Sequence, residues 1–160
     1  MKYWYGLVFL LGIVLGFGIS LLAPLDIGSL TGLSISGFVV SDVGAPSDWV
    51  SEDDIIVLDD RVILKVGNAT LSNYADSGSM KPVFDVGANG IRVVPGSEVG
   101  VGVGDIVSFY LGDSLIVHRV VEKGVDGDGV YFVTMGDNGL VDDGKVRFEQ
   151  IEYVTIGVIW

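Results

Sequence analysis

An uncharged apolar run near the N-terminus constrains this chain more than any other feature. Residues 3–22 read YWYGLVFLLGIVLGFGISLL and contain no Asp, Glu, Lys or Arg. That is about the 20 residues that a helix needs to cross the hydrocarbon core of a bilayer. Lys2 precedes the run, and the Tyr-Trp-Tyr cluster at its start is typical of a membrane interface. We therefore expect a single transmembrane helix, with residues 1–24 as a membrane anchor.

A cleavable signal peptide is the alternative interpretation of the same run. Signal peptides have a shorter apolar region followed by a small-x-small cleavage site. Here the run is longer, and Pro24 stands in the segment LLAPLD where such a site would lie, so a retained anchor is favoured.

The orientation of the anchor follows from the basic residues. After Lys2 the next basic residue is Arg61, and basic flanks tend to stay in the cytoplasm. We expect a single-pass protein of the cell membrane, or of the endoplasmic-reticulum membrane in a eukaryote. Its domain would lie on the extracytoplasmic side with membrane lipid as its neighbour.

Composition excludes several classes of function. The net charge of −12 argues against nucleic-acid binding, because phosphate contacts need clustered Lys and Arg. The absence of cysteine removes thiol nucleophiles and disulfides, and a single histidine rules out sites with several His ligands. The fragment DGDG at 126–129 lacks the closing Glu of a calcium loop, so a hairpin turn is favoured. No metal or cofactor is expected.

After Pro24 the sequence becomes typical of a β protein. Glycine is frequent, with 24 in the whole chain, and no window shows a helical apolar period of useful length. Runs rich in β-branched and aromatic residues occur at 55–66 (IIVLDDRVILKV), 106–110 (IVSFY), 115–122 (LIVHRVVE), 130–134 (VYFVT) and 153–160 (YVTIGVIW). The first of these predicts two strands around an Asp-Asp turn. We expect a mostly antiparallel β domain from about residue 33 to 160.

The segment YADSGSMKPVF, residues 74–84, contains a candidate nucleophile. A serine hydroxyl needs a base within hydrogen-bond reach, and that base is usually held by a third group. His118 is the only imidazole available to Ser79. A lone histidine on an apolar strand is, however, more often a packed core residue. Asp137 follows an apolar strand in FVTMGDNG, where it could hold a histidine on a neighbouring strand or simply form a turn.

Four segments together resemble a known family. SGSMKP (77–82), VGDIVSF (103–109), IVHRVVE (116–122) and FVTMGDNG (132–139) follow the N-terminal apolar run in this order. They are similar to the sequence boxes of type I signal peptidases, in the archaeal and endoplasmic-reticulum branch that carries histidine in place of a catalytic lysine. The resemblance implies a membrane-anchored serine endopeptidase with a signal-peptidase-like antiparallel β domain.

The resemblance also assigns roles to residues. It implies Ser79 as nucleophile, His118 as general base, and Asp137 as the first essential aspartate, which would support His118. For the second aspartate we choose Asp143, with Asp142 as the near alternative. The hydroxyl of Ser77 and the backbone N–H of Ser79 would form the oxyanion hole. Met80 would wall a substrate pocket, or only pack in the core.

The implied reaction is removal of signal peptides from translocated preproteins, with small side chains at the first and third positions before the cut. The preprotein is then the main partner, and the protein-export channel or other membrane subunits are further candidates. Three segments are expected: the anchor at 1–24, an added β segment at 25–74, and the catalytic core at 75–160. The added segment departs from most relatives, in which the Ser-Met box follows the membrane helix closely. It also contains the glycosylation sequon Asn68-Ala-Thr.

Two other functions remain open. A serine peptidase of the self-cleaving repressor type shares the β architecture, but it would need Lys at position 118. A membrane-tethered, non-catalytic β domain would bind a partner without chemistry. That alternative does not require Ser79, His118 and Asp137 to come together in space.

Overall fold

The computed structural model describes residues 44–160, and the predicted membrane span at 3–22 lies outside them. The regular elements of this part are nine strands and two short 3-10 helices, η2 (Glu52–Asp54) and η3 (Phe148–Gln150). No helix within 44–160 is long and apolar enough to span a membrane. The prediction of a mostly β domain with antiparallel pairing is confirmed.

The strands form two sheets. The smaller is the hairpin of β1 (Ile55–Val57) and β2 (Val62–Leu64), which confirms the two strands predicted around the Asp-Asp turn. The larger has the order β3-β4-β9-β5-β6-β7-β8. Its members are β3 (Thr70–Asn73), β4 (Asn89–Val93), β5 (Ile106–Leu111), β6 (Ser114–Asp126), β7 (Gly129–Met135), β8 (Lys145–Arg147) and β9 (Ile151–Ile159).

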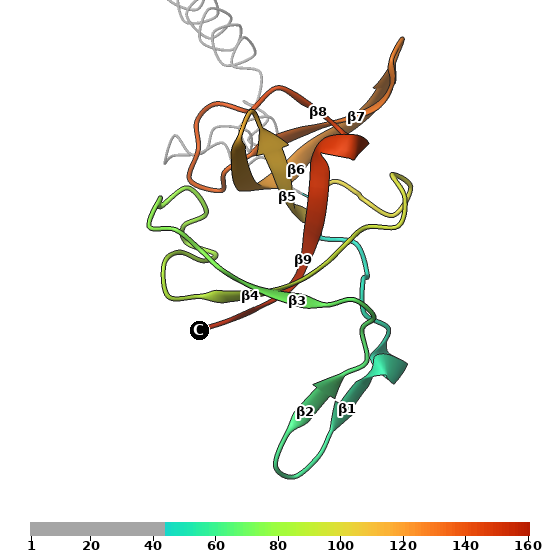
Figure 1. The fold of residues 1–160 in the computed structure, drawn as a ribbon, viewed down its shortest axis with the longest axis vertical. Helices are drawn as coiled ribbons and strands as arrows, with labels where there is room; N and C mark the ends of the chain where they lie inside the picture. The colour runs from blue at the N-terminus through green and yellow to red at the C-terminus, as the bar shows by residue number, and fades with distance from the viewer. Residues whose placement is uncertain (1–43) are drawn as a thin grey trace, which may run out of the picture. The chain divides into compact units, whose positions relative to one another are not determined.

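Strand β9 joins the two halves of the large sheet (Figure 1). Its first part pairs with β5 and its last part pairs with β4, both antiparallel. Strands β5 to β7 follow one another through tight hairpins. Gly112 has a φ of +62° in the β5–β6 turn, a conformation that glycine adopts without steric cost. The DGDG fragment forms the β6–β7 turn, with Asp126 paired to Gly129, as a hairpin turn requires.

Two apolar clusters hold the large sheet together. The main one contains Val101, Val107, Phe109, Val120, Phe132, Val146, Ile151 and Val154. The second contains Met80, Phe84, Ala88 and Ile106. Burial of such side chains removes them from water at a gain of roughly 1.5–3 kcal/mol each. Met80 and Phe84 of the second cluster belong to the segment that carries Ser79, so packing positions the candidate nucleophile.

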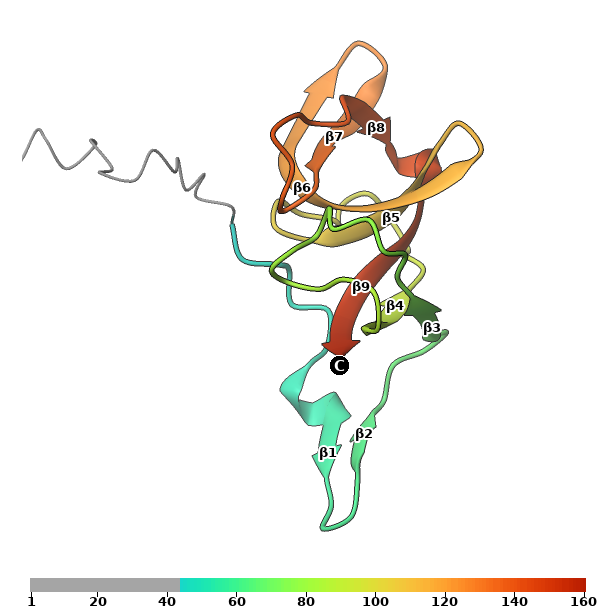
Figure 2. The ribbon, with the colours of Figure 1, turned by 90° about the vertical axis from the view of Figure 1, so that its left-hand side faces the viewer.

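The boundary predicted after residue 74 does not separate the sheets. Strand β3 belongs to the predicted added segment, yet all four of its residues pair with β4 of the large sheet. Only the β1–β2 hairpin forms a sheet of its own, and Figure 2 shows it extending away from the seven strands. Asn68 of the sequon is exposed and has a φ of +55° in the connection between β2 and β3.

Candidate active site

Ser79 lies in the loop between β3 and β4, which is anchored on both sides of Ser79 by packed side chains. Met80 is only 3% exposed and packs in the second cluster. The rings of Tyr74 and Phe84 stack with their centroids 4.1 Å apart. Packing on both sides of Ser79 therefore holds its loop in place.

The hydroxyls of Ser77 and Ser79 face each other across Gly78. Their Oγ atoms are 3.2 Å apart, and the backbone N–H of Ser79 donates to Ser77 Oγ at 3.3 Å. Gly78 has a φ of +66°, in the left-handed region that favours glycine and allows this tight approach. The two predicted oxyanion-hole donors are thus adjacent to the Ser79 hydroxyl.

Two polar side chains fix the backbone of this turn. Asp85 Oδ1 accepts a hydrogen bond from the Gly78 N–H at 3.2 Å. On the other side Asn138 Nδ2 donates to the Gly78 carbonyl at 3.2 Å, and the Asn138 N–H donates to the Ser79 carbonyl at 2.8 Å. The segment that follows β7 is therefore bonded directly to the serine loop.

His118 on β6 has a carboxylate partner. Its Nδ1 lies 2.7 Å from Asp143 Oδ2, and the two side chains are 16% and 14% exposed. Thr134 Oγ1 donates to the same Asp143 oxygen at 2.8 Å, and the Asp143 N–H donates to the Thr134 carbonyl at 2.8 Å. A carboxylate bound at Nδ1 favours the tautomer with the proton there, which leaves the lone pair on Nε2.

Gly136 shows that His118 Nε2 is directed toward the serine loop. A Cβ placed on Gly136 would lie 3.0 Å from His118 Nε2 and 2.7 Å from the Ser79 carbonyl oxygen. His118 Nε2, the atom that would act as a base, and the backbone of Ser79 therefore both lie next to the Cβ position of Gly136. Within 44–160 no hydrogen bond joins Ser79 Oγ to His118, and contacts of this kind often tighten only when substrate binds.

Asp137 was expected to support His118, but it binds a different residue. Its two oxygens accept hydrogen bonds from Arg119 Nε and Nη2, both at 2.7 Å, rather than contacting His118. The bidentate hydrogen bonding with Asp137 raises the pKa of the Arg119 guanidinium. Arg119 also donates to the Gly104 carbonyl at 2.8 Å. Asp143, not Asp137, thus contacts His118. Asp142 is exposed, and within 44–160 its carboxylate accepts only the Gly144 N–H, at 2.9 Å.

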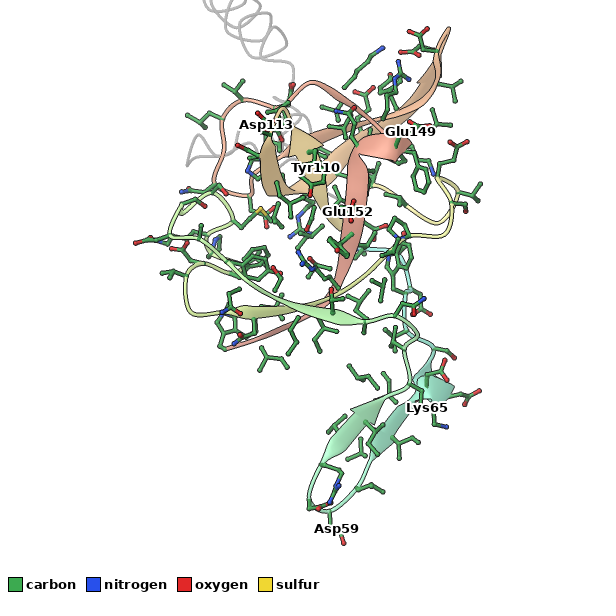
Figure 3. The ribbon with its side chains drawn as sticks, in the orientation of Figure 1. Asp59, Lys65, Tyr110, Asp113, Glu149 and Glu152 are labelled. Atoms are coloured by element: carbon green, nitrogen blue, oxygen red, sulfur yellow. The ribbon has the colours of Figure 1, made fainter. Side chains whose placement is uncertain are left out.

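Lys81 follows Ser79 closely but is held by another residue. Its Nζ forms an ion pair of 2.6 Å with Asp85, and this hydrogen bond raises the pKa of the lysine. Lys65 lies directly after β2, at the base of the β1–β2 hairpin (Figure 3). Neither lysine is among the residues that line the cleft at Ser79.

A cleft of about 410 Å³ joins the serine loop to β6. It is lined by Ser72, Asn73, Tyr74, Ala75, Ser77, Ser79, Met80, Phe84, Asp85, Arg92, Leu115, Ile116, Val117 and His118. Residues 114–118 of β6 pair with β5 along one edge, whereas the pairing of β6 with β7 begins only at Arg119. The other edge of this part of β6 therefore has no strand partner among the described residues.

Several residues that shape the site were given no role from the sequence: Asp85, Thr134, Gly136 and Asn138. Thr134 carried a signal, because it is the one Ser or Thr in the otherwise aliphatic and aromatic run VYFVT, and the structure buries it fully. Gly136 and Asn138 were visible only as turn residues. Within 44–160 no group of three or more His, Cys, Asp or Glu side chains could hold a metal ion.

Comparisons with known proteins identify no relative. No family model, no curated protein and no solved structure matches the chain.

Proposed function

We propose that this chain is a membrane-anchored serine endopeptidase that removes signal peptides from translocated preproteins. The observation that carries the proposal is the 2.7 Å contact of His118 Nδ1 with Asp143, on a cleft that Ser79 also lines. Ser79, His118 and Asp143 have the residue types of a nucleophile, a base and the group that orients the base. The four sequence boxes and the apolar N-terminal run support the choice of substrate.

In the proposed reaction, Ser79 Oγ attacks the carbonyl carbon of the scissile bond and its proton passes to His118 Nε2. Asp143 stabilises the imidazolium, which then gives the proton to the leaving amine as the C–N bond breaks. A water molecule, deprotonated by His118, hydrolyses the resulting ester and frees Ser79. The Ser77 hydroxyl and the Ser79 N–H serve the developing oxyanion, where such donors are worth about 3 kcal/mol each.

The substrate lies as an extended chain against the unpaired edge of β6 at 114–118, where it adds a strand next to His118. Apolar lining residues such as Met80, Phe84 and Ile116 favour apolar side chains in this cleft. The preference for small side chains at the first and third positions before the cut follows from the resemblance. Asp137 contributes through Arg119, because that pair fixes the start of the loop that carries Asn138. The anchor at 1–24 holds the cleft near the bilayer from which the substrate emerges.

Cleavage of a preprotein by the full-length protein in detergent tests the proposal. Ser79→Ala is expected to abolish cleavage with an unchanged melting temperature, because the hydroxyl contributes chemistry rather than packing. Ser97→Ala, an exposed serine that does not line the cleft, serves as the matched control and should cleave normally. A folded Ser79→Ala protein with full activity contradicts the proposal. Binding of signal peptides without cleavage by the unmodified protein would favour the non-catalytic alternative.

A further inference from the structure

The cleft at Ser79 contains one cation, Arg92 on β4, for which the proposed reaction has no use. Among the described residues that line this cleft, Arg92 is the only Lys or Arg. The chain carries 21 acidic residues against 9 basic ones, so a basic side chain in a substrate cleft is an exception here. Its surroundings show how it is held and which of its atoms are free.

Two contacts fix the orientation of the Arg92 side chain. The guanidinium carbon lies 3.9 Å from the centroid of the Tyr153 ring, a stacked cation–π arrangement. Nε donates to Thr70 Oγ1 on β3 at 3.1 Å. In addition, the pairing of β4 with β9 shifts register between Ile91 and Arg92, an irregularity that re-aims the side chain of a strand residue.

These contacts leave the far end of the guanidinium without a partner. Within the described part of the chain no carboxylate lies within 4.0 Å of Arg92, and neither Nη atom donates a hydrogen bond. Two other cations of the candidate site are paired with carboxylates, Lys81 with Asp85 and Arg119 with Asp137. Arg92 therefore keeps its fork of donors available in a half-buried position.

We propose that Arg92 is a specificity-determining residue that binds the carboxylate of an Asp or Glu side chain in the substrate. The inference rests on the proposed peptidase function. The planar fork of Nη donors matches a carboxylate in two parallel hydrogen bonds, and the Tyr153 ring pre-orients the fork so that little rotamer freedom is lost on binding. The acidic side chain belongs to the few substrate residues that the cleft holds around the scissile bond.

The test uses short peptides that span a cleavage site, are amidated at the C-terminus and differ by one Asp-for-Asn exchange at each position near the cut. Amidation removes the chain's own terminal carboxylate as a competing ligand. The full-length protein in non-ionic detergent is expected to cleave the Asp peptide with about fivefold higher kcat/KM at one or more positions, the size of a partly exposed ion pair. The difference should shrink as salt is added.

Substitutions assign that preference to Arg92. In Arg92→Gln the ratio of kcat/KM for the Asp and Asn peptides should fall to about one, and in Arg92→Glu a Lys peptide should become the better substrate. Arg92→Lys keeps the charge but loses the fork, so part of the preference should remain. Arg61→Gln makes the same change in net charge on the β1–β2 hairpin and should leave the ratio as it was. A preference absent at every position, or unchanged in Arg92→Gln, overturns the inference.

Peptide affinity for Ser79→Ala separates this inference from the proposed function. Tighter binding of the Asp peptide to Ser79→Ala, lost when Arg92→Gln is added, supports the carboxylate site even if the unmodified protein cleaves no peptide. Cleavage of all peptides at equal rates and with equal affinity leaves the peptidase intact and refutes the role of Arg92.

Discussion

His118 Nδ1 and Asp143 Oδ2 are 2.7 Å apart, and the Thr134 hydroxyl donates to the same carboxylate oxygen at 2.8 Å. Asp143 is therefore held in place by a buried strand residue and can in turn hold the imidazole. Asp142, its neighbour in the sequence, forms no hydrogen bond or ion pair with His118. The two aspartates that the sequence left as alternatives have different structural roles.

Asp143→Asn should lower kcat by about 10³- to 10⁴-fold, because an amide can donate to Nδ1 and favour the wrong tautomer. Asp142→Asn is the matched control and should retain normal activity, since an asparagine oxygen can still accept the Gly144 N–H. Initial rates on one preprotein, with melting temperatures for all three proteins, decide the matter. An inactive Asp142→Asn beside an active Asp143→Asn would reverse the assignment.

Asp137→Asn should act chiefly through stability. The Arg119 and Asp137 side chains are each 13% exposed, and removal of the carboxylate leaves the guanidinium without its ionic partner. We expect a loss of roughly 2 kcal/mol in the free energy of unfolding. The fall in kcat should be smaller than for Asp143→Asn. A stable Asp137→Asn protein with activity as low as that of Asp143→Asn would instead give Asp137 a direct catalytic role.

Strands β5, β6, β7 and β9 could be predicted because long runs of β-branched and aromatic residues leave little alternative. Strands β3 and β8 have only four and three residues, too few to show a period. Strand β4 begins with Asn89-Gly90, a pair that ordinarily indicates a turn. Gly90 is needed there for another reason, because a Cβ would overlap the Tyr74 hydroxyl.

The choice among the aspartates could not be made from the sequence. Asp137, Asp142 and Asp143 follow β7 in one irregular loop, and no periodicity predicts the path of such a segment. Thr134 decides the path, because its carbonyl accepts the Asp143 N–H while its hydroxyl binds the carboxylate. Likewise the availability of Arg92 depends on Tyr153 and Thr70, which are distant in the sequence.

Acid should reveal the ion pairs at the turn between β6 and β7. Lys145 and Arg147 bind the Asp126 carboxylate and lower its pKa from 3.8 to about 2. The resulting stabilisation of the folded state is fully present above pH 3.8, the unperturbed pKa, and is lost as the pH falls through about 2. Asp126→Asn should therefore lower the melting temperature at neutral pH, and its difference from the unmodified protein should close toward pH 2.

Asp113→Asn is the control for that experiment, because Asp113 lies in the β5–β6 turn at the other end of β6 (Figure 3) and forms no ion pair within 44–160. Its melting temperature should follow that of the unmodified protein at every pH. If the difference in melting temperature between Asp126→Asn and the unmodified protein stays constant down to pH 2, the stabilisation does not come from the charge of Asp126.

Lys81→Ala should retain most activity. Asp85 raises the pKa of Lys81 and so keeps the amine protonated, whereas a general base needs a free lone pair. His118→Ala should lose several orders of magnitude in rate, and His118→Lys should not restore it, because Asp143 would hold the ammonium in its charged form. We would compare the initial rates of the three variants on one preprotein. An inactive but folded Lys81→Ala with an active His118→Ala would refute the Ser-His-Asp mechanism.

Gly136→Ala tests the proximity of the serine loop and the imidazole. The added methyl group would come within 2.7 Å of the Ser79 carbonyl oxygen and 3.0 Å of His118 Nε2, so one of the two must move. Because the carbonyl is fixed by Asn138, we expect a loss of about 1–3 kcal/mol in stability together with at least a tenfold fall in kcat. Gly127→Ala, whose methyl group would meet no atom within 4 Å apart from its neighbours in the chain, is the matched control and should leave both unchanged. Full activity and stability in Gly136→Ala would mean that Ser79 and His118 do not share this point in the working enzyme.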